Sequence, residues 1–267
     1  MTLRSARAGE GPPLVLIHGL GGSHIVWEPV MDLLARERDV IAVDLPGFGD
    51  SDPLPVRTRH SPLEMGRTVS AHLESLGVER PHLAGNSLGA WTALEMAADG
   101  NAASVCGISP AGLWRRKLGP RAYNTRKAGQ RARGFITRAV RTERGRRALL
   151  ATTMARPELL SPDEAVRWVA AWLDAPSYDD ANDMMRGDPF ERADEVDVPV
   201  TIVWGERDRL VRPPLKERMP LGTRYSTAPG WGHTPTRDDP EGVARVLLEA
   251  SAGDRRGSKG HQTTARA

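Results

Sequence analysis

The residues best suited to chemistry in this sequence are a serine and its flanking glycines, in the run Gly85-Asn86-Ser87-Leu88-Gly89. A serine hydroxyl acts as a nucleophile where a sharp turn between a strand and a helix exposes it. Side chains two residues before and after the serine would collide in such a turn, and glycine avoids the collision. The pattern alone is weak, because an ordinary glycine-rich turn also produces it. A strand-like run before Ser87 and a helix-like run after it favour the catalytic interpretation.

A serine nucleophile needs a base, usually a histidine that a carboxylate orients. Of the seven histidines, His233 follows the last strand-like run and precedes the last helix-like run, where parallel-sheet enzymes carry reactive groups. Asp208 follows another strand-like run, so the order along the chain is serine, aspartate, histidine. Glu206 is the competing acid, and Asp44 precedes the serine, which favours a structural role. The sequence therefore predicts a triad of Ser87, Asp208 and His233.

A glycine-rich loop, His18-Gly19-Leu20-Gly21-Gly22, follows the first long apolar run. Backbone N–H groups in such a loop are free to donate, and we expect those of Leu20 and Leu88 to hold a developing oxyanion together. The competing interpretation is a phosphate-binding loop. It is disfavoured because the loop has no lysine and lacks the Gly-x-Gly-x-x-Gly order.

The elements that must position these residues alternate along the chain. Short apolar runs predict buried strands at residues 14–17, 40–43, 82–84, 105–108 and 200–204. Helical patterns fall at residues 61–77, 90–98 and 239–250. The alternation predicts an α/β fold, with a mostly parallel central sheet that helices cover on both faces.

Residues 113–190 interrupt this alternation. They contain no clear strand, and Ser161-Pro162-Asp163-Glu164 has the order of a capping box that starts a helix. We therefore expect a core of residues 1–112 and 191–250, and a helical cap of residues 113–190 inserted before the acid-bearing strand. Residues 251–267 are polar, basic and without periodicity, which predicts a disordered tail.

Taken together, these motifs resemble the α/β-hydrolase superfamily. The resemblance rests on His18-Gly19, the run from Asp44 to Ser51, the Ser87 turn, Gly205-x-x-Asp208 and Gly232-His233. It implies a mostly parallel sheet with a helical lid, and a serine hydrolase that cleaves a carboxylic ester or thioester through an acyl-enzyme. Two departures stand out. Few residues precede the first core strand, which leaves open whether the sheet is one strand short at its edge, and Ala90 stands where many relatives have a second glycine.

The resemblance also bears on alternative activities. Haloalkane dehalogenases and epoxide hydrolases of this fold use an aspartate nucleophile, so Ser87 disfavours both. Carbon–carbon bond hydrolases share the Gly-Asn-Ser turn, but they typically have a tryptophan soon after the histidine, where this chain has Thr234-Pro235-Thr236. A lyase or cyclase at the same site stays open, as does a non-enzymatic ligand-binding module. We expect no metal and no organic cofactor, because the proposed chemistry needs neither.

The predicted cap is basic, with thirteen Arg or Lys and one acid between Arg115 and Arg147. Attraction of an anionic or carrier-linked small-molecule substrate is one interpretation, and a solvated helical face is the other. The tryptophans of this region fit an apolar acyl pocket, although two of them at i and i+4 fit plain packing equally well. The candidate substrate contacts are Gly19, Asn86, Trp114, Trp168 and Trp172.

The bulk composition is that of a globular protein: 267 residues, 39% hydrophobic and 27% charged, with a net charge of +3. The single cysteine, Cys106, excludes an intrachain disulfide. The first residues lack the apolar stretch of a signal peptide, and no run approaches the roughly 18 apolar residues of a membrane span. We therefore expect a cytoplasmic protein with no membrane partner and, since no recognition motif is present, no nucleic-acid partner.

Overall fold

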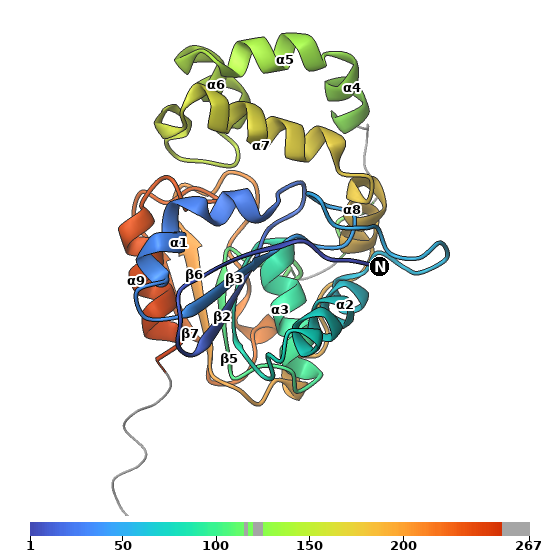
Figure 1. Ribbon diagram of the computed structural model, residues 1–267, viewed down its shortest axis with the longest axis vertical. Helices are drawn as coiled ribbons and strands as arrows, with labels where there is room; N and C mark the ends of the chain where they lie inside the picture. The colour runs from blue at the N-terminus through green and yellow to red at the C-terminus, as the bar shows by residue number, and fades with distance from the viewer. Residues whose placement is uncertain (115–116, 120–124, 253–267) are drawn as a thin grey trace, which may run out of the picture.

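The computed structural model describes residues 1–114, 117–119 and 125–252. At its centre is a seven-stranded sheet in the order β1-β3-β2-β4-β5-β6-β7 (Figure 1). β1 is antiparallel to β3, and every other neighbouring pair is parallel. This confirms the predicted α/β fold with a mostly parallel sheet. The strands are β1 (Ser5–Ala8), β2 (Pro13–Ile17), β3 (Asp39–Val43), β4 (His82–Asn86), β5 (Ser104–Ile108), β6 (Val200–Gly205) and β7 (Arg224–Ala228).

Helices cover both faces of the sheet, which explains the apolar runs of its central strands. Val15 and Ile17 of β2 share a buried cluster with α2 (Pro62–Ser75) and α3 (Leu88–Ala98). Leu14 and Leu16 alternate with them and join a second cluster with α1 (Glu28–Leu34) and α9 (Pro240–Ala250). Because successive side chains of a strand point to opposite faces, a strand buried on both faces must be apolar throughout.

The N-terminal edge of the sheet holds a strand that the sequence did not indicate. β1 pairs with β3 through its backbone, and Arg7 of β1 donates two hydrogen bonds, of 2.7 and 2.6 Å, to the Asp39 carboxylate. Its sequence, Ser-Ala-Arg-Ala, contains no large apolar side chain, because an edge strand buries little. The two edges of the sheet are therefore β1 and β7.

Two helix starts that the sequence indicated are present, with different caps. Ser61 caps α2 by accepting a hydrogen bond from the Glu64 N–H, but the Glu64 carboxylate pairs with Arg67 instead of turning back to the cap. Ser161 caps α7 (Pro162–Asp174) with a complete capping box, in which Glu164 accepts from the Ser161 N–H. The second cap therefore satisfies one more backbone donor than the first.

A helical insertion lies between β5 and β6. α7 lies between the sheet-bearing core and the outer helices α5 and α6 (Figure 1). Buried side chains of α5, α7 and the connecting segments form a small separate cluster that includes Val140, Val169 and Leu173. The remaining helices of the insertion are α4 (Thr125–Arg131), α5 (Arg133–Val140), α6 (Glu143–Leu150), η2 (Pro157–Leu159) and α8 (Tyr178–Gly187).

The short 3₁₀ helices elsewhere are η1 (His24–Trp27), η3 (Ala193–Glu195) and η4 (Lys216–Arg218). Of the predicted disordered tail, residues 251–267, the part from 253 to 267 lies outside the described residues, whereas Ser251 and Ala252 are described and close α9. Across the described ranges, no helix has both the length and the apolar character needed to cross a bilayer.

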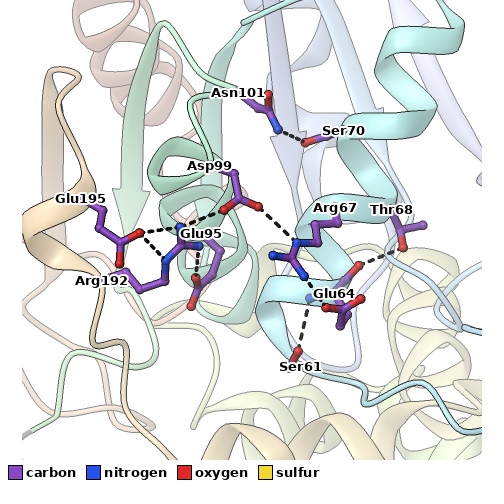
Figure 2. A network of polar contacts seen from close by, with 10 residues as sticks. All are labelled: Ser61, Glu64, Arg67, Thr68, Ser70, Glu95, Asp99, Asn101, Arg192 and Glu195. Carbon is purple, nitrogen blue, oxygen red and sulfur yellow. Dashed lines mark hydrogen bonds and ion pairs between the residues drawn. The ribbon is translucent and has the colours of Figure 1, made fainter.

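A polar network joins α2, α3 and η3 on the outside of the core (Figure 2). Arg192, just before η3, contacts the carboxylates of Glu95, Asp99 and Glu195. Asp99, at the end of α3, also accepts from Arg67 of α2 at 3.4 Å. The network therefore ties the segment that leaves the insertion to the helix that begins after Ser87.

Candidate active site

Ser87 occupies a strained turn between β4 and α3. Its backbone has φ 55° and ψ −116°, a conformation that costs about 1–3 kcal/mol for a residue other than glycine. The two nearby glycines permit the turn: a Cβ on Gly85 would overlap the backbone of Gly89 and Ala90, and one on Gly89 would overlap the Ile17 carbonyl. The Ser87 N–H donates to the Ile108 carbonyl at 3.0 Å, so β5 holds the turn in place.

Asp208 and His233 form a buried pair at the ends of neighbouring loops. The His233 Nδ1 lies 2.7 Å from Asp208 Oδ2, and both side chains are almost fully buried. Burial raises the pKa of Asp208, but the bonds from His233 and from the N–H groups of Leu210 and Val211 outweigh it and leave that pKa below its usual value. An ionised Asp208 only accepts, so Nδ1 carries the proton and Nε2 is left free to act as a base.

The two loops approach so closely because a glycine ends β6. A Cβ on Gly205 would overlap the carbonyl oxygens of Trp231 and Gly232. The Arg207 N–H also donates to the Trp231 carbonyl at 2.9 Å. The backbone contact between the two loops therefore sets the distance between the aspartate and the histidine.

Asn86 connects the serine turn to the histidine loop. Its Nδ2 donates to the Ile108 carbonyl at 3.1 Å and to the His233 carbonyl at 2.7 Å, and its Oδ1 accepts from Thr234 Oγ1 at 3.1 Å. Sequence reasoning placed Asn86 against the substrate, but this buried amide is directed into the protein. No hydrogen bond joins Ser87 to His233 directly within the described residues. Such bonds commonly tighten only when substrate binds.

The glycine-rich loop after β2 packs directly on the serine turn, because a Cβ on Gly19 would lie 3.2 Å from that of Ser87. His18 fixes the loop: its Nε2 accepts from the Leu45 N–H at 3.0 Å, so its protonated Nδ1 donates to the Gly19 carbonyl at 2.8 Å. Burial lowers the pKa of His18, which keeps it neutral. In the part of the chain described, the Leu20 and Leu88 N–H groups have no acceptor.

The three candidate tryptophans lie in different surroundings. Trp172 stands against the glycine-rich loop with Tyr178: the two rings meet edge to face at 6.4 Å, and a Cβ on Gly21 would lie 2.9 Å from Trp172. Trp114 packs edge to face on Trp91 of α3 at 5.8 Å, and its buried indole N–H has no partner among the described residues. Trp168 packs against buried residues of both the core and the insertion, as expected if it has a packing role and does not contact substrate.

The competing residues are engaged elsewhere. Glu206 is exposed and contacts Thr227 at 3.4 Å. Asp44 is fully buried and accepts from the backbone N–H groups of His24 and Asp50, which fits a structural carboxylate. Within the described ranges, no group of three or more His, Cys, Asp or Glu side chains is arranged to hold a metal ion.

Residues 14–246 match the model of the alpha/beta hydrolase family. The chain belongs to this family. A dihydrolipoyllysine-residue acetyltransferase component of an acetoin cleaving system from Pseudomonas putida is 31% identical over 256 residues, covering 90% of this chain. The chain spans only 64% of the length of that protein.

Two further relatives carry the names of enzymes. The epoxide hydrolase EphH of Mycobacterium tuberculosis is 31% identical over 194 residues, which cover 67% of this chain and 89% of that protein. The crystal structure of a membrane phospholipase A, a bacterial virulence factor, superposes with a TM-score of 0.68 at 27% identity, covering 94% of this chain and 83% of that one. This chain thus has the α/β-hydrolase fold.

Sequence reasoning missed two features of the site. Tyr178 lies against Gly21 beside Trp172, although nothing in its local sequence points to the glycine-rich loop. Asp238 is almost fully buried and accepts from the backbone around His233. A sequence pattern could have drawn attention to Asp238. Two consecutive acids precede Pro240, and only the second, Asp239, is needed to cap α9.

Proposed function

We propose that this chain is a serine hydrolase that cleaves a small carboxylic ester or thioester through an acyl-enzyme on Ser87. The observation that carries the proposal is the buried pair of Asp208 and His233, whose side chains are 2.7 Å apart. Asn86 in turn binds the His233 carbonyl and so ties the histidine loop to the serine turn. An activated serine needs a base in this tautomer, with Nδ1 protonated and Nε2 free.

The cycle uses only groups of the protein and water. Ser87 Oγ attacks the carbonyl carbon while His233 Nε2 takes its proton, and Asp208 stabilises the imidazolium that results. The N–H groups of Leu20 and Leu88 bind the oxyanion. The tetrahedral intermediate then expels the alcohol or thiol, which takes the proton from His233. Water attacks the acyl-enzyme while His233 Nε2 takes its proton. His233 then returns that proton to Ser87 Oγ as the bond to the acyl carbon breaks and the carboxylic acid leaves.

The helices α4–α8 are proposed to cap this site. Trp172 and Tyr178 reach the glycine-rich loop from the insertion, where they would face the acyl group of a substrate. The buried Trp114 indole N–H, which has no partner among the described residues, would be a further donor to a substrate oxygen that reached it. An apolar wall with a few polar groups is the usual composition of a small-molecule pocket.

The basic character of the insertion only partly favours an anionic or carrier-linked substrate. Arg126, Arg133 and Arg141 are paired with acids of the insertion itself. Arg131, Arg138 and Arg144 have no acidic partner among the described residues. Neutral esters are therefore the first class to test, and the same acyl groups on an anionic carrier are the second.

Labelling with a fluorophosphonate tests the activated serine without knowledge of the substrate. We expect one adduct, mapped by mass spectrometry to Ser87, that is lost in Ser87→Ala. Ser104→Ala is the matched control. Ser104 is also buried, but it lies at the start of β5, at the opposite end of the strands from Ser87. A folded wild-type protein that takes no label, or takes it at another residue, would overturn the proposal.

A further inference from the structure

The loop that carries His233 is attached to the insertion by a buried carboxylate. Asp238 is 1% exposed and accepts three backbone hydrogen bonds. One comes from Gly232 in its own loop at 2.9 Å, and two come from Ala155 and Arg156 of the insertion at 3.0 and 2.8 Å. No cation is paired with this carboxylate among the described residues, so these three donors replace the water that it has lost.

The same two segments meet at two further points. The Thr234 N–H donates to the Thr153 carbonyl at 2.8 Å. A Cβ on Gly232 would overlap the backbone of Met154 and Ala155, so glycine permits their close approach. We call this set of contacts between residues 153–156 and 232–238 the clasp.

A side-chain ion pair reinforces the clasp from α7. Arg237 binds the carboxylate of Glu164, whose second oxygen accepts from the Ser161 N–H in the capping box. The ion pair therefore joins the histidine loop to the first turn of α7. Side chains of α7 in turn share the separate cluster of the insertion with Met154 of the clasp.

The backbone around His233 is consequently held from two sides. Asn86 of the core binds its carbonyl, while the clasp binds the N–H groups of its two neighbours, Gly232 and Thr234. We propose that Asp238 is a positioning residue for His233, and that through it residues 153–156 determine whether the imidazole stands ready to take the proton of Ser87. This inference rests on the proposed function, because it assigns His233 the role of base.

The isosteric variant Asp238→Asn tests the inference. Asparagine keeps one carbonyl oxygen but turns an N–H₂ toward at least one of the three donors. We expect fluorophosphonate labelling of Ser87 to slow by about 10- to 100-fold, because small displacements of a catalytic group cost this much. Asp39→Asn is the matched control: it removes another largely buried carboxylate, at the opposite end of the sheet.

A second readout separates positioning from stability. The proton between His233 Nδ1 and Asp208 should give a low-field NMR resonance that moves or broadens in Asp238→Asn and stays unchanged in Asp39→Asn. A folded Asp238→Asn protein with the wild-type labelling rate and an unchanged resonance would overturn the inference. The resonance can be measured without any reaction, so it tests the positioning role even if the wild-type protein takes no label. Absence of labelling in the wild type would count against the proposed function and not against the positioning role.

Glu164→Gln tests the side of the insertion without altering the histidine loop. It weakens the ion pair with Arg237, and we expect labelling to slow on the order of threefold to tenfold. The double variant with Asp238→Asn should be no slower than Asp238→Asn alone, since both changes loosen one connection. Unchanged labelling in a folded Glu164→Gln protein, or strictly multiplicative effects in the double variant, would contradict the coupling. The first of these outcomes, unchanged labelling in Glu164→Gln, remains decisive if Asp238→Asn proves unstable.

Discussion

Gly89 packs so closely on Ile17 that a methyl group on Gly89 would overlap the main-chain carbonyl oxygen of Ile17. The contact joins the first turn of α3 to the end of β2, where the glycine-rich loop begins. Gly89→Ala must therefore either move the helix or move this loop, and both carry a proposed oxyanion donor. We expect fluorophosphonate labelling to fall at least about 10²-fold, the typical cost of one misplaced donor.

The control for Gly89→Ala is Gly134→Ala. Gly134 lies within α5, and a Cβ there would meet no other atom within 4 Å. Since alanine is the better helix former, this variant should be more stable by about 0.5–1 kcal/mol in urea unfolding and should take the label at the wild-type rate. Equal labelling of both variants would show that the Gly89 contact does not constrain the site.

Asp208→Asn should keep the fold and lose most of the activity. An asparagine that donates to Nδ1 would hold the histidine in the other tautomer, with Nε2 protonated and unable to act as a base. We expect kcat on an ester substrate to fall by about 10⁴-fold. Glu206→Gln, on the same turn but exposed, should retain full activity. A larger loss of activity in Glu206→Gln than in Asp208→Asn would mean that Glu206, and not Asp208, orients the histidine.

A different His–Asp pair should make the stability of the fold depend on pH. The hydrogen bond that the His24 ring donates to Asp44 raises the pKa of His24 above its usual value, although burial opposes this rise, and Asp44 is itself fully buried. A histidine with a raised pKa stabilises the fold fully below its unfolded pKa, and this contribution is lost as the pH rises through the folded value. His24→Ala should therefore lower the free energy of unfolding by about 1–2 kcal/mol near pH 6 and by less near pH 8.

Urea unfolding of both proteins at the two pH values measures this difference. His72→Ala is the control, because burial alone lowers the pKa of His72 and no carboxylate is involved. A gap between wild type and His24→Ala that widens as the pH rises would contradict the assignment.

The sequence predicted the fold well where burial leaves a pattern, and poorly where it does not. β2 and β3 are buried on both faces and were visible as apolar runs, whereas β1, at an edge, is held by backbone pairing and an Arg7–Asp39 ion pair. The candidate triad could be named from loops at strand ends. Asn86 and Asp238 could not be given positioning roles, because their partners, such as the His233 carbonyl and the Ala155 N–H, are backbone groups distant in sequence.

Cys106 should be inert in the native protein. It is 2% exposed on β5, and burial raises its pKa to about 12. Alkylation requires the thiolate and access to it, so native protein should not react with iodoacetamide near neutral pH. Unfolded protein should gain one adduct by mass, since the chain has a single cysteine. Rapid alkylation without unfolding would mean that this strand opens locally.

Arg192, at the centre of the polar network in Figure 2, should contribute to the stability of the fold by an amount that depends on pH. Burial raises the pKa of Glu95, while hydrogen bonds from Trp91 and Arg192 oppose that rise. A carboxyl with a raised pKa favours the fold below its unfolded value, and this contribution is lost as the pH rises through the folded value. Arg192→Ala removes the cation that faces Glu95, so the pKa of Glu95 should rise further.

Arg192→Ala should therefore cost about 1–3 kcal/mol of unfolding free energy at neutral pH and less near pH 4, because protonation of Glu95 weakens its pairing with Arg192. Glu95→Gln removes the buried charge and should recover part of this loss in the double variant. Urea unfolding of the four proteins at the two pH values gives the coupling energy directly. A coupling of zero at neutral pH would show that Glu95 and Arg192 act independently, and that Asp99 and Glu195 account for the role of Arg192 in the network.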